Sequence, residues 1–342
     1  REVHIVLPLP PDEFRKVSVD IIPNTDWGER FQRVLAQATR VIVTSEYHTD
    51  TNQIALHYAN LIQDGLAILR ARVLDTEPVA LAVWDRQAGD GPGGTAALVK
   101  YWRAQGRETT IIDTTQLSAK IDQTASSING ASECREIVHQ ATTSTHFPQK
   151  IMAMLFADVV GYSRLKEPEI PCFVEHFMGT VAELLQSFPQ PPVVKNTWGD
   201  ALYFVFRKVE DAGLFALDLC DRLSNTDWTK KGLPKDLSIR IGLHAGPVFA
   251  CREPILGKRN YTGTHVSWAA RIEPITPPGQ VYASQPFAAL AAAHGFIRFA
   301  CDYVGQIPLA KGYGTFPLYH VRRISNTNKE KSVISIEPDD LL

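Results

Sequence analysis

Two aspartates in the second half of the sequence adjoin runs of apolar residues that are typical of buried strands. Asp158 follows the run Met152–Phe156, and Asp200 comes just before the run Ala201–Phe206, after a tight turn expected at Trp198-Gly199. If these two strands are neighbours, the two carboxylates lie at one edge of a sheet and repel each other unless a cation lies between them. Oxygen ligands with no Cys or His nearby favour Mg²⁺ or Mn²⁺. Either aspartate alone is more often a turn former, so the metal-site hypothesis depends on the pair.

Five short motifs occur in a fixed order around these aspartates: "LFADVVGYSRL", "NTWGD", "IRIGLHAGPV", "YTGTHVSWAARIE" and "LAKGYG". In order and spacing they resemble the catalytic domain of the class III nucleotidyl cyclases, the adenylate and guanylate cyclases. The resemblance covers about residues 150–322. It implies an enzyme that cyclises a nucleoside triphosphate to a 3′,5′-cyclic nucleotide and pyrophosphate in intracellular signalling.

The resemblance also implies two metal ions, Mg²⁺ or Mn²⁺, in each site. Their protein ligands would be the carboxylates of Asp158 and Asp200 and the backbone carbonyl of Val159. One ion would lower the pKa of the ribose 3′-hydroxyl, and the other would hold the triphosphate.

Positive groups for the triphosphate are implied at three further places. The turn Gly161–Ser163, which includes Tyr162, would present backbone N–H groups to phosphate oxygens. Arg271 matches the family arginine that stabilises charge on the transferring phosphoryl group, and Lys311 matches a lysine that contacts the triphosphate. The structural alternatives are a surface helix arginine paired with Glu273 and a solvated loop lysine.

The residues that read the base in adenylyl cyclases are replaced in this sequence. The base-reading lysine corresponds to Asn196, with Lys195 displaced to the opposite side of the strand, and its aspartate partner corresponds to Asn260. Because an Asn/Asn pair offers both donors and acceptors, it could read adenine, guanine or a pyrimidine. The ribose-orienting asparagine corresponds to Ser267, whose shorter side chain predicts slow turnover or altered geometry. His265 is expected to face outward or pack rather than replace that asparagine.

In this family the metal aspartates come from one subunit, and the base-reading, arginine and lysine groups come from the other. This chain carries both sets, so the resemblance implies a homodimer with two composite sites. A monomer is expected to be inactive.

Three functions are compatible with this pattern. The first is an active adenylate or guanylate cyclase type of enzyme, regulated by an N-terminal sensor. The second is a pyrimidine cyclase, acting on CTP or UTP, of the anti-phage signalling type, which resembles class III domains but lacks the purine-reading pair. The third is a weakly active cyclase-like module that binds nucleotides for regulation. Retention of both aspartates, Arg271 and Lys311 argues against the third function, whereas Ser267 argues for it.

The elements expected in residues 150–323 must bring these side chains together. Their order, β-α-β-β-α-β, predicts an α+β fold with a ferredoxin-like antiparallel core. One apolar stripe predicts a helix that contains Phe173, Phe177, Val181, Leu184 and Phe188. Strict alternation predicts a strand with Leu237, Ile239, Ile241 and Leu243 facing inward.

Residues 1–118 alternate strand and helix patterns, which predicts an α/β Rossmann-like domain, complete or truncated. The glycine-rich loop Asp85–Val99 lies where such sheets bind ligands, and Thr95 opens a helix whose N-terminus favours anions. Both a ligand-sensing module and a flexible turn are compatible with this loop. Residues 119–149 are polar and predict a linker, and residues 324–342 predict a flexible tail.

Composition limits the classes of partner. The net charge of -2 creates no field that would attract nucleic acid or an anionic membrane. The five cysteines include no CxxC pair, which argues against zinc or a disulfide framework and favours a reducing compartment. No apolar run reaches the length of a membrane helix, and no signal peptide is recognisable. We therefore expect a cytoplasmic protein whose partners are a nucleoside triphosphate and a second copy of the chain.

Overall fold

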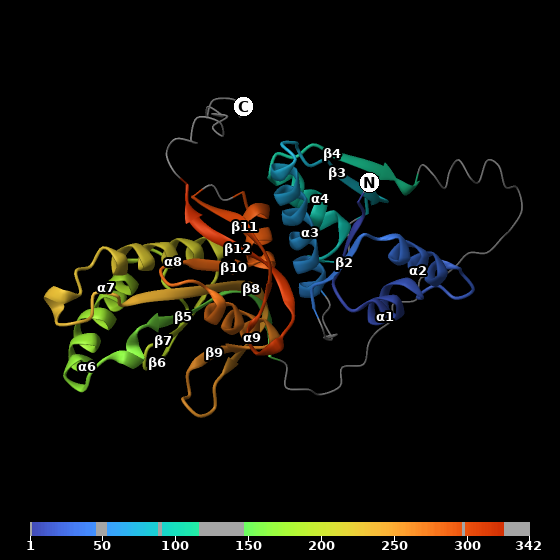
Figure 1. Cartoon of the computed structure of the whole chain (residues 1–342). Coiled ribbons are helices and arrows are strands. Elements are labelled where there is room, and N and C mark those ends of the chain that lie inside the picture. Colours follow the sequence, from blue (N-terminus) through green and yellow to red (C-terminus); the bar gives the residue numbers. More distant parts are fainter. Residues whose placement is uncertain (1, 46–52, 88–90, 116–146, 296–297, 325–342) are drawn as a thin grey trace, which may run out of the picture. The chain divides into compact units, whose positions relative to one another are not determined.

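The computed structural model of the chain describes residues 2–45, 53–87, 91–115, 147–295 and 298–324 (Figure 1). The chain divides into two compact units. Unit 1 comprises Arg1–Ile151, Gly246–Thr262 and Ala292–Gly295, and unit 2 comprises Met152–Ala245, Gly263–Ala291 and Phe296–Leu342. The predicted linker, apart from residues 147–149, and the predicted tail beyond residue 324 lie outside the described residues.

Unit 1 begins with two short parallel strands. β1 (His4–Leu7) pairs with β2 (Arg40–Val43), with His4 opposite Arg40. The chain between them forms three helical segments, which are α1 (Pro11–Phe14), the π-helical turn η1 (Arg15–Val19) and α2 (Trp27–Gln37). Both strands agree with the strand and helix patterns predicted for residues 1–118, in which α2 was not predicted separately.

A long helix and a second parallel pair of strands follow. α3 (Gln53–Val73) precedes β3 (Ala80–Trp84), which pairs with β4 (Thr109–Asp113) after a connection through α4 (Thr95–Ala104). The core between β3 and α4 consists of Ala80, Ala82, Val99 and Trp102. The predicted alternation of strands and helices is confirmed here, but β1–β2 and β3–β4 form two separate sheets. The Rossmann-like class itself stays a prediction.

The main sheet contains eight strands within the described residues, in the order β11-β12-β10-β8-β5-β7-β6, with β9 paired to β8. They are β5 (Gln149–Val160), β6 (Val194–Trp198), β7 (Ala201–Phe206), β8 (Ser238–Arg252), β9 (Arg259–Thr262), β10 (Val281–Ser284), β11 (Phe299–Pro308) and β12 (Thr315–Arg323). The predicted β-α-β-β-α-β order is present from β5 to β8. The predicted ferredoxin-like antiparallel core does not describe the whole sheet, because β10, which follows that core, runs parallel to β8 after a helical crossover. The sheet is therefore mixed.

Most helical segments of this part of the chain are short, and the longest of those described is α8 with 16 residues. They are η2 (Tyr162–Arg164), η3 (Glu167–Glu169), α6 (Ile170–Cys172), the π-helical η4 (Phe173–Met178), α7 (Gly179–Ser187), α8 (Val209–Ser224), η5 (Thr229–Lys231), α9 (Thr264–Ile272), η6 (Glu273–Ile275), α10 (Gln285–Ala293) and η7 (Ala310–Gly312). No helix in the described part of the chain is both long enough and apolar enough to cross a membrane.

Both apolar patterns predicted for unit 2 are confirmed by burial. The helical stripe is buried at Phe173, Phe177, Val181 and Leu184, and the half-buried Phe188 packs edge-on against Phe215. The alternating strand is buried at Leu237, Ile239, Ile241 and Leu243. These contacts fix the ends of β5, β7 and β8, from which the predicted site residues extend.

Candidate active site

Strand pairing brings the two predicted metal aspartates to one edge of the sheet. β5 and β7 are antiparallel neighbours, which was the condition of the metal-site hypothesis, and Ala157 lies opposite Leu202. Asp158 is the next residue along β5, and Asp200 comes just before the start of β7. The two carboxylates therefore belong to adjacent strand ends.

The hairpin that carries Asp200 closes with Trp198 opposite Ala201. Its two-residue turn is therefore Gly199-Asp200, one residue later than predicted. Gly199 has a φ of +64°, in the left-handed region where glycine is strain-free. The aspartate thus lies within the turn itself rather than after it.

The two aspartates interact electrostatically. Burial raises the pKa of Asp200, and the negative charge of Asp158 raises it further, whereas Arg240 lowers it. The edge therefore concentrates negative charge that a cation would stabilise.

Arg240 is a site residue that the sequence analysis missed. Its Nη2 donates a hydrogen bond of 2.9 Å to Oδ2 of Asp158, and its Nε donates to Oε1 of Glu273. The guanidinium thus joins β5 and β8 to the segment that follows α9. A detectable signal existed, because Arg240 is the single basic residue within the alternating run Leu237–Leu243.

Glu273 lies with this group rather than with Arg271. Burial raises the pKa of Glu273, whereas the Arg240 charge lowers it. The structural alternative for Arg271, a helix arginine paired with Glu273, is therefore wrong, since Glu273 forms its ion pair with Arg240.

The predicted phosphate-binding turn has a backbone that requires glycine. Gly161 has a φ of +98°, and the short helix η2 begins after it with a hydrogen bond of 3.1 Å from the Arg164 backbone N–H to the Gly161 carbonyl. The ring of Tyr162 packs on Phe173, with centroids 4.8 Å apart, so it anchors the turn to the core. Ser163 lies inside η2 and is exposed.

Arg271 lies near the end of α9 and stacks on an aromatic ring. Its Cζ atom is 3.8 Å from the ring centroid of Tyr313. Its Nη1 donates a hydrogen bond of 3.0 Å to the backbone carbonyl of Ser267, one helical turn earlier. Its Nε is the one buried side-chain nitrogen or oxygen, among the described residues, that lacks a hydrogen-bond partner. An unsatisfied buried donor is unfavourable, which makes this arginine a candidate for a ligand.

Lys311 occupies a strained backbone position. Its φ is +62°, in the left-handed region that non-glycine residues rarely adopt, and its side chain is exposed. A hydrogen bond of 2.8 Å from the Leu309 N–H to the Gly314 carbonyl closes the loop around it. Such strain often occurs at functional sites, and both a triphosphate contact and a solvated lysine are compatible with this loop.

The predicted base-reading asparagines lie in different compact units, Asn196 in unit 2 and Asn260 in unit 1. Asn196 lies on β6 opposite Tyr203, and Lys195 next to it is exposed, consistent with opposite sides of the strand. Asn260 lies on β9, where its Oδ1 accepts a hydrogen bond of 2.9 Å from the Tyr261 backbone N–H. Neither observation selects a base.

Ser267 and His265 both lie on α9, but their surroundings differ. Ser267 is exposed, and its carbonyl holds Arg271. His265 packs inward, since its Nδ1 is 2.8 Å from Nε2 of His244, which in turn contacts Ser284 Oγ at 2.7 Å. Burial lowers the pKa of His265 to about 4. The structure confirms that His265 packs, and that it does not replace the ribose-orienting asparagine stays a prediction.

The donor set at the strand edge fits a hard divalent cation. Asp158 and Asp200 are close enough for the charge of one to shift the pKa of the other. Across the described ranges, no group of three or more His, Cys, Asp or Glu side chains is arranged to hold a metal ion. Mg²⁺ sites commonly combine one or two carboxylates with water and substrate phosphates, so two aspartates suffice.

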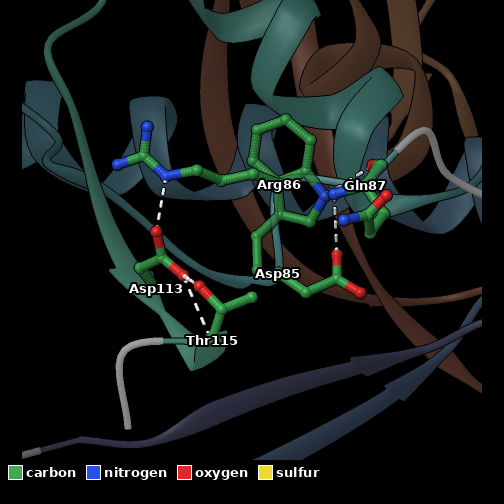
Figure 2. A network of polar contacts seen from close by, with 6 residues as sticks. Asp85, Arg86, Gln87, Asp113 and Thr115 are labelled. Atoms are coloured by element: carbon green, nitrogen blue, oxygen red, sulfur yellow. Dashed lines mark hydrogen bonds and ion pairs between the residues drawn. The ribbon is translucent and has the colours of Figure 1, made fainter. Parts of the chain in front are cut away.

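Figure 2 shows a polar network at the ends of β3 and β4, where the N-terminal ligand loop was predicted. Arg86 Nε donates a hydrogen bond of 2.7 Å to Asp113, which also accepts one of 2.6 Å from Thr115. The Gln87 backbone N–H donates to Asp85 at 3.0 Å. These groups satisfy one another and do not indicate a particular ligand.

The glycine-rich loop has a packing function at Gly93. A Cβ atom at this position would lie only 2.4 Å from Cβ of Leu56, and its carbonyl accepts a hydrogen bond of 2.9 Å from Asn60 Nδ2. Gly93 is therefore required by close contact with α3. Residues 88–90 of the loop lie outside the described residues, and a ligand-sensing role stays a prediction.

Known proteins match the second half of the chain, which contains the candidate site. A family model described as the adenylate and guanylate cyclase catalytic domain matches residues 146–322, just over half of the chain. The guanylate cyclase domain of RhGC from Catenaria anguillulae, in complex with GTP, is 20% identical with a TM-score of 0.45, over 52% of this chain and 100% of that one. The adenylyl cyclase CyaB from P. aeruginosa is 16% identical with a TM-score of 0.46, over 53% and 98% of the two chains. No curated protein sequence matches the chain. From the match to the family model, we conclude that the chain belongs to the adenylate and guanylate cyclase catalytic domain family and is a nucleotide cyclase.

Proposed function

We propose that this cyclase is metal-dependent and converts a nucleoside triphosphate to pyrophosphate and a 3′,5′-cyclic nucleotide. The cyclic nucleotide would serve in intracellular signalling. The observation that carries the proposal is the pair Asp158 and Asp200 at adjacent strand ends, where the charge of one raises the pKa of the other. The pair lies within the part of the chain that the family model matches.

Asp158, Asp200 and the backbone carbonyl of Val159 would hold two Mg²⁺ or Mn²⁺ ions. The chemistry supplied by bound ions is a lower pKa of the ribose 3′-hydroxyl and positive charge against the triphosphate. Arg240 holds the Asp158 carboxylate in one orientation through its 2.9 Å hydrogen bond. The protein thus prearranges one carboxylate before any ligand binds.

The remaining residues would bind and orient the triphosphate. Backbone N–H groups of the turn from Gly161 to Ser163 would donate to phosphate oxygens. Arg271 would place a delocalised positive charge against the phosphoryl group as it transfers, and Lys311 would add a point charge on its strained loop. None of these roles requires the protein to gain or lose a proton, and the proton of the ribose 3′-hydroxyl would pass to solvent.

We further propose that the active form is a homodimer with composite sites. The chain carries both the aspartate set and the set of Arg271, Lys311 and the two asparagines. Two copies related by a two-fold axis would then form two equivalent sites. Each site would take its aspartates from one copy and its arginine from the other.

A pyrimidine substrate is the second candidate, and Asn196 with Asn260 is the observation that favours it. Neither carries the charge of a purine-reading Lys/Asp pair, and their amides can both donate and accept. CTP and UTP therefore belong in the same assay as ATP and GTP.

One experiment tests the proposal. The purified protein is incubated with Mn²⁺ and each of the four nucleoside triphosphates, and the products are identified by mass. We expect one cyclic nucleotide, and we expect Asp158→Ala and Asp200→Ala each to lose about three orders of magnitude in rate. Asp302→Ala, which removes an exposed carboxylate on β11, is the matched control and should keep full activity. Near wild-type turnover in either site variant would refute the metal assignment, and nucleotide binding without any cyclic product would favour a regulatory module.

A further inference from the structure

The guanidinium of Arg271 is held by few contacts, and the largest of these is an aromatic face. Its Cζ lies 3.8 Å from the Tyr313 ring centroid, and one hydrogen bond of 3.0 Å joins it to the Ser267 carbonyl. Its Nε is buried without a partner. Because a hydrogen bond to one carbonyl leaves rotation about that bond possible, the stacking on Tyr313 is what fixes the plane of the guanidinium.

Tyr313 is itself held firmly. Its ring packs edge-on against the ring of Trp268, with centroids 5.5 Å apart, and lies tilted beside the ring of Phe316, with centroids 6.2 Å apart. It also packs against a buried cluster that contains Ile272 and Leu309. Trp268 lies three residues before Arg271 on α9, so both face the same side of the helix. The ring of Tyr313 therefore contacts two side chains of α9 at once.

Tyr313 lies in the same loop as Lys311, which is predicted together with Arg271 to contact the triphosphate. Lys311 is two residues before Tyr313, and the loop is closed by the bond from the Leu309 N–H to the Gly314 carbonyl. Lys311 adopts a φ of +62° and Gly314 one of +112° within this loop. Docking the Tyr313 ring on α9 thus sets the position of Lys311 relative to Arg271.

We propose that Tyr313 is a positioning residue for the cyclisation reaction, acting through Arg271. Its ring holds the guanidinium flat, so that N–H groups at the guanidinium edge face the triphosphate while the face is shielded. The proposal rests on the proposed function of Arg271 and adds the residue that orients it.

Three substitutions separate the ring from the hydroxyl. Tyr313→Phe keeps the aromatic face, and we expect it to retain kcat within twofold. Tyr313→Leu keeps apolar volume but removes the face, and we expect kcat to fall about tenfold with KM changed less than threefold, which is about 1.4 kcal/mol of transition-state stabilisation. Tyr303→Leu is the matched control, since Tyr303 is an exposed tyrosine on β11 that packs edge-on against Tyr319. It should leave both constants unchanged.

A double-mutant cycle tests whether Tyr313 acts through Arg271. In an Arg271→Ala background, Tyr313→Leu should cause no further loss of kcat, because the group it positions is absent. An equal tenfold loss in both backgrounds would overturn the proposal. If Arg271→Ala itself left kcat unchanged, the proposed role of Arg271 would fail; if Arg271→Ala lowered kcat while Tyr313→Leu did not, the positioning role alone would fail.

Two further measurements do not depend on the leucine variant, and the first of them needs no substrate. A guanidinium over a ring has its N–H resonances shifted upfield by the ring current. The Arg271 Nε–H signal, assigned by its loss in Arg271→Lys, should therefore be upfield in the wild type and in Tyr313→Phe.

Phenylalanine analogues of increasing fluorination at position 313 keep the ring shape but weaken its negative face, and kcat should fall stepwise along the series. An unshifted Nε–H signal, or kcat independent of fluorination, would overturn the proposal.

Discussion

Replacing Arg240 with methionine removes a cation that contacts both Asp158 and Glu273. Methionine keeps an unbranched apolar stem of similar reach but donates no hydrogen bond. The variant leaves two partly buried carboxylates, with Asp200 nearby, without their common partner. We therefore expect Arg240→Met to destabilise the metal-free protein.

The size of this effect follows from exposure. Removing one partner of a fully buried ion pair costs about 3–5 kcal/mol, and an exposed pair contributes about 0–1 kcal/mol. The side chains of Arg240 and Asp158 are 30% and 27% exposed, and that of Glu273 is 13% exposed. These values lie between the two limits, so we expect a loss of about 2–3 kcal/mol. For a domain of roughly 150–250 residues, this lowers Tm by about 5–10 °C.

The loss should depend on pH with a defined sign. Burial raises the pKa of Glu273, and Arg240 lowers it, so removing Arg240 raises the folded-state pKa further above the unfolded value. A carboxyl with a raised folded pKa contributes stability at low pH that is lost as pH rises through that pKa. The deficit of Arg240→Met should therefore be smaller at about pH 5 than at pH 8, and adding Mn²⁺ at pH 8 should reduce it.

Thermal unfolding at the two pH values measures this prediction directly. Arg322→Met is the matched control, because Arg322 pairs with Asp302 where both side chains are more than 40% exposed, and it should shift Tm by about 2 °C or less. Combining Arg240→Met with Glu273→Gln removes one of the stranded charges and should recover part of the loss. Equal Tm values for the wild type and Arg240→Met, or a deficit that grows at low pH, would refute the reasoning.

Three further predictions test other parts of the structure. Mixing the inactive variants Asp200→Ala and Arg271→Ala under conditions of verified subunit exchange should restore up to about a quarter of wild-type activity, because half of the dimers contain one intact composite site; no recovery would contradict shared sites. Unfolding free energy, measured by urea titration, should fall as pH decreases from about 6.5 to 4, because the His265 pKa of about 4 lets the unfolded state bind the proton first. That contribution is about 3 kcal/mol, and a His265→Gln variant with an equally steep profile would contradict it. Lys311→Gly should relieve left-handed strain of about 1 kcal/mol, seen as a higher Tm, yet lower turnover; unchanged turnover would argue against a role for the lysine.

The sequence by itself determined the features that depend on a short local pattern of residues. The alternation of Leu237 to Leu243 and the helical stripe around Phe177 were predicted because burial follows backbone period directly. The pairing of the strands that carry Asp158 and Asp200 was the condition of the metal-site hypothesis, and the structure meets it. The helix α2 was missed, and β10 parallel to β8 made the sheet mixed, because strand direction depends on how a crossover packs rather than on local pattern.

Only the tertiary structure decided which groups satisfy one another. Arg240 contacts Asp158 and Glu273 over sequence separations of 82 and 33 residues, and no spacing rule connects these positions. The stacking of Arg271 on Tyr313 joins a helix to a loop in the same way. Gly93 appeared to belong to a ligand loop until its contact with Leu56 showed that packing requires it. Charge pairing and ring stacking act between side chains close in space, so they are determined when the strands and helices pack and not by the order of residues alone.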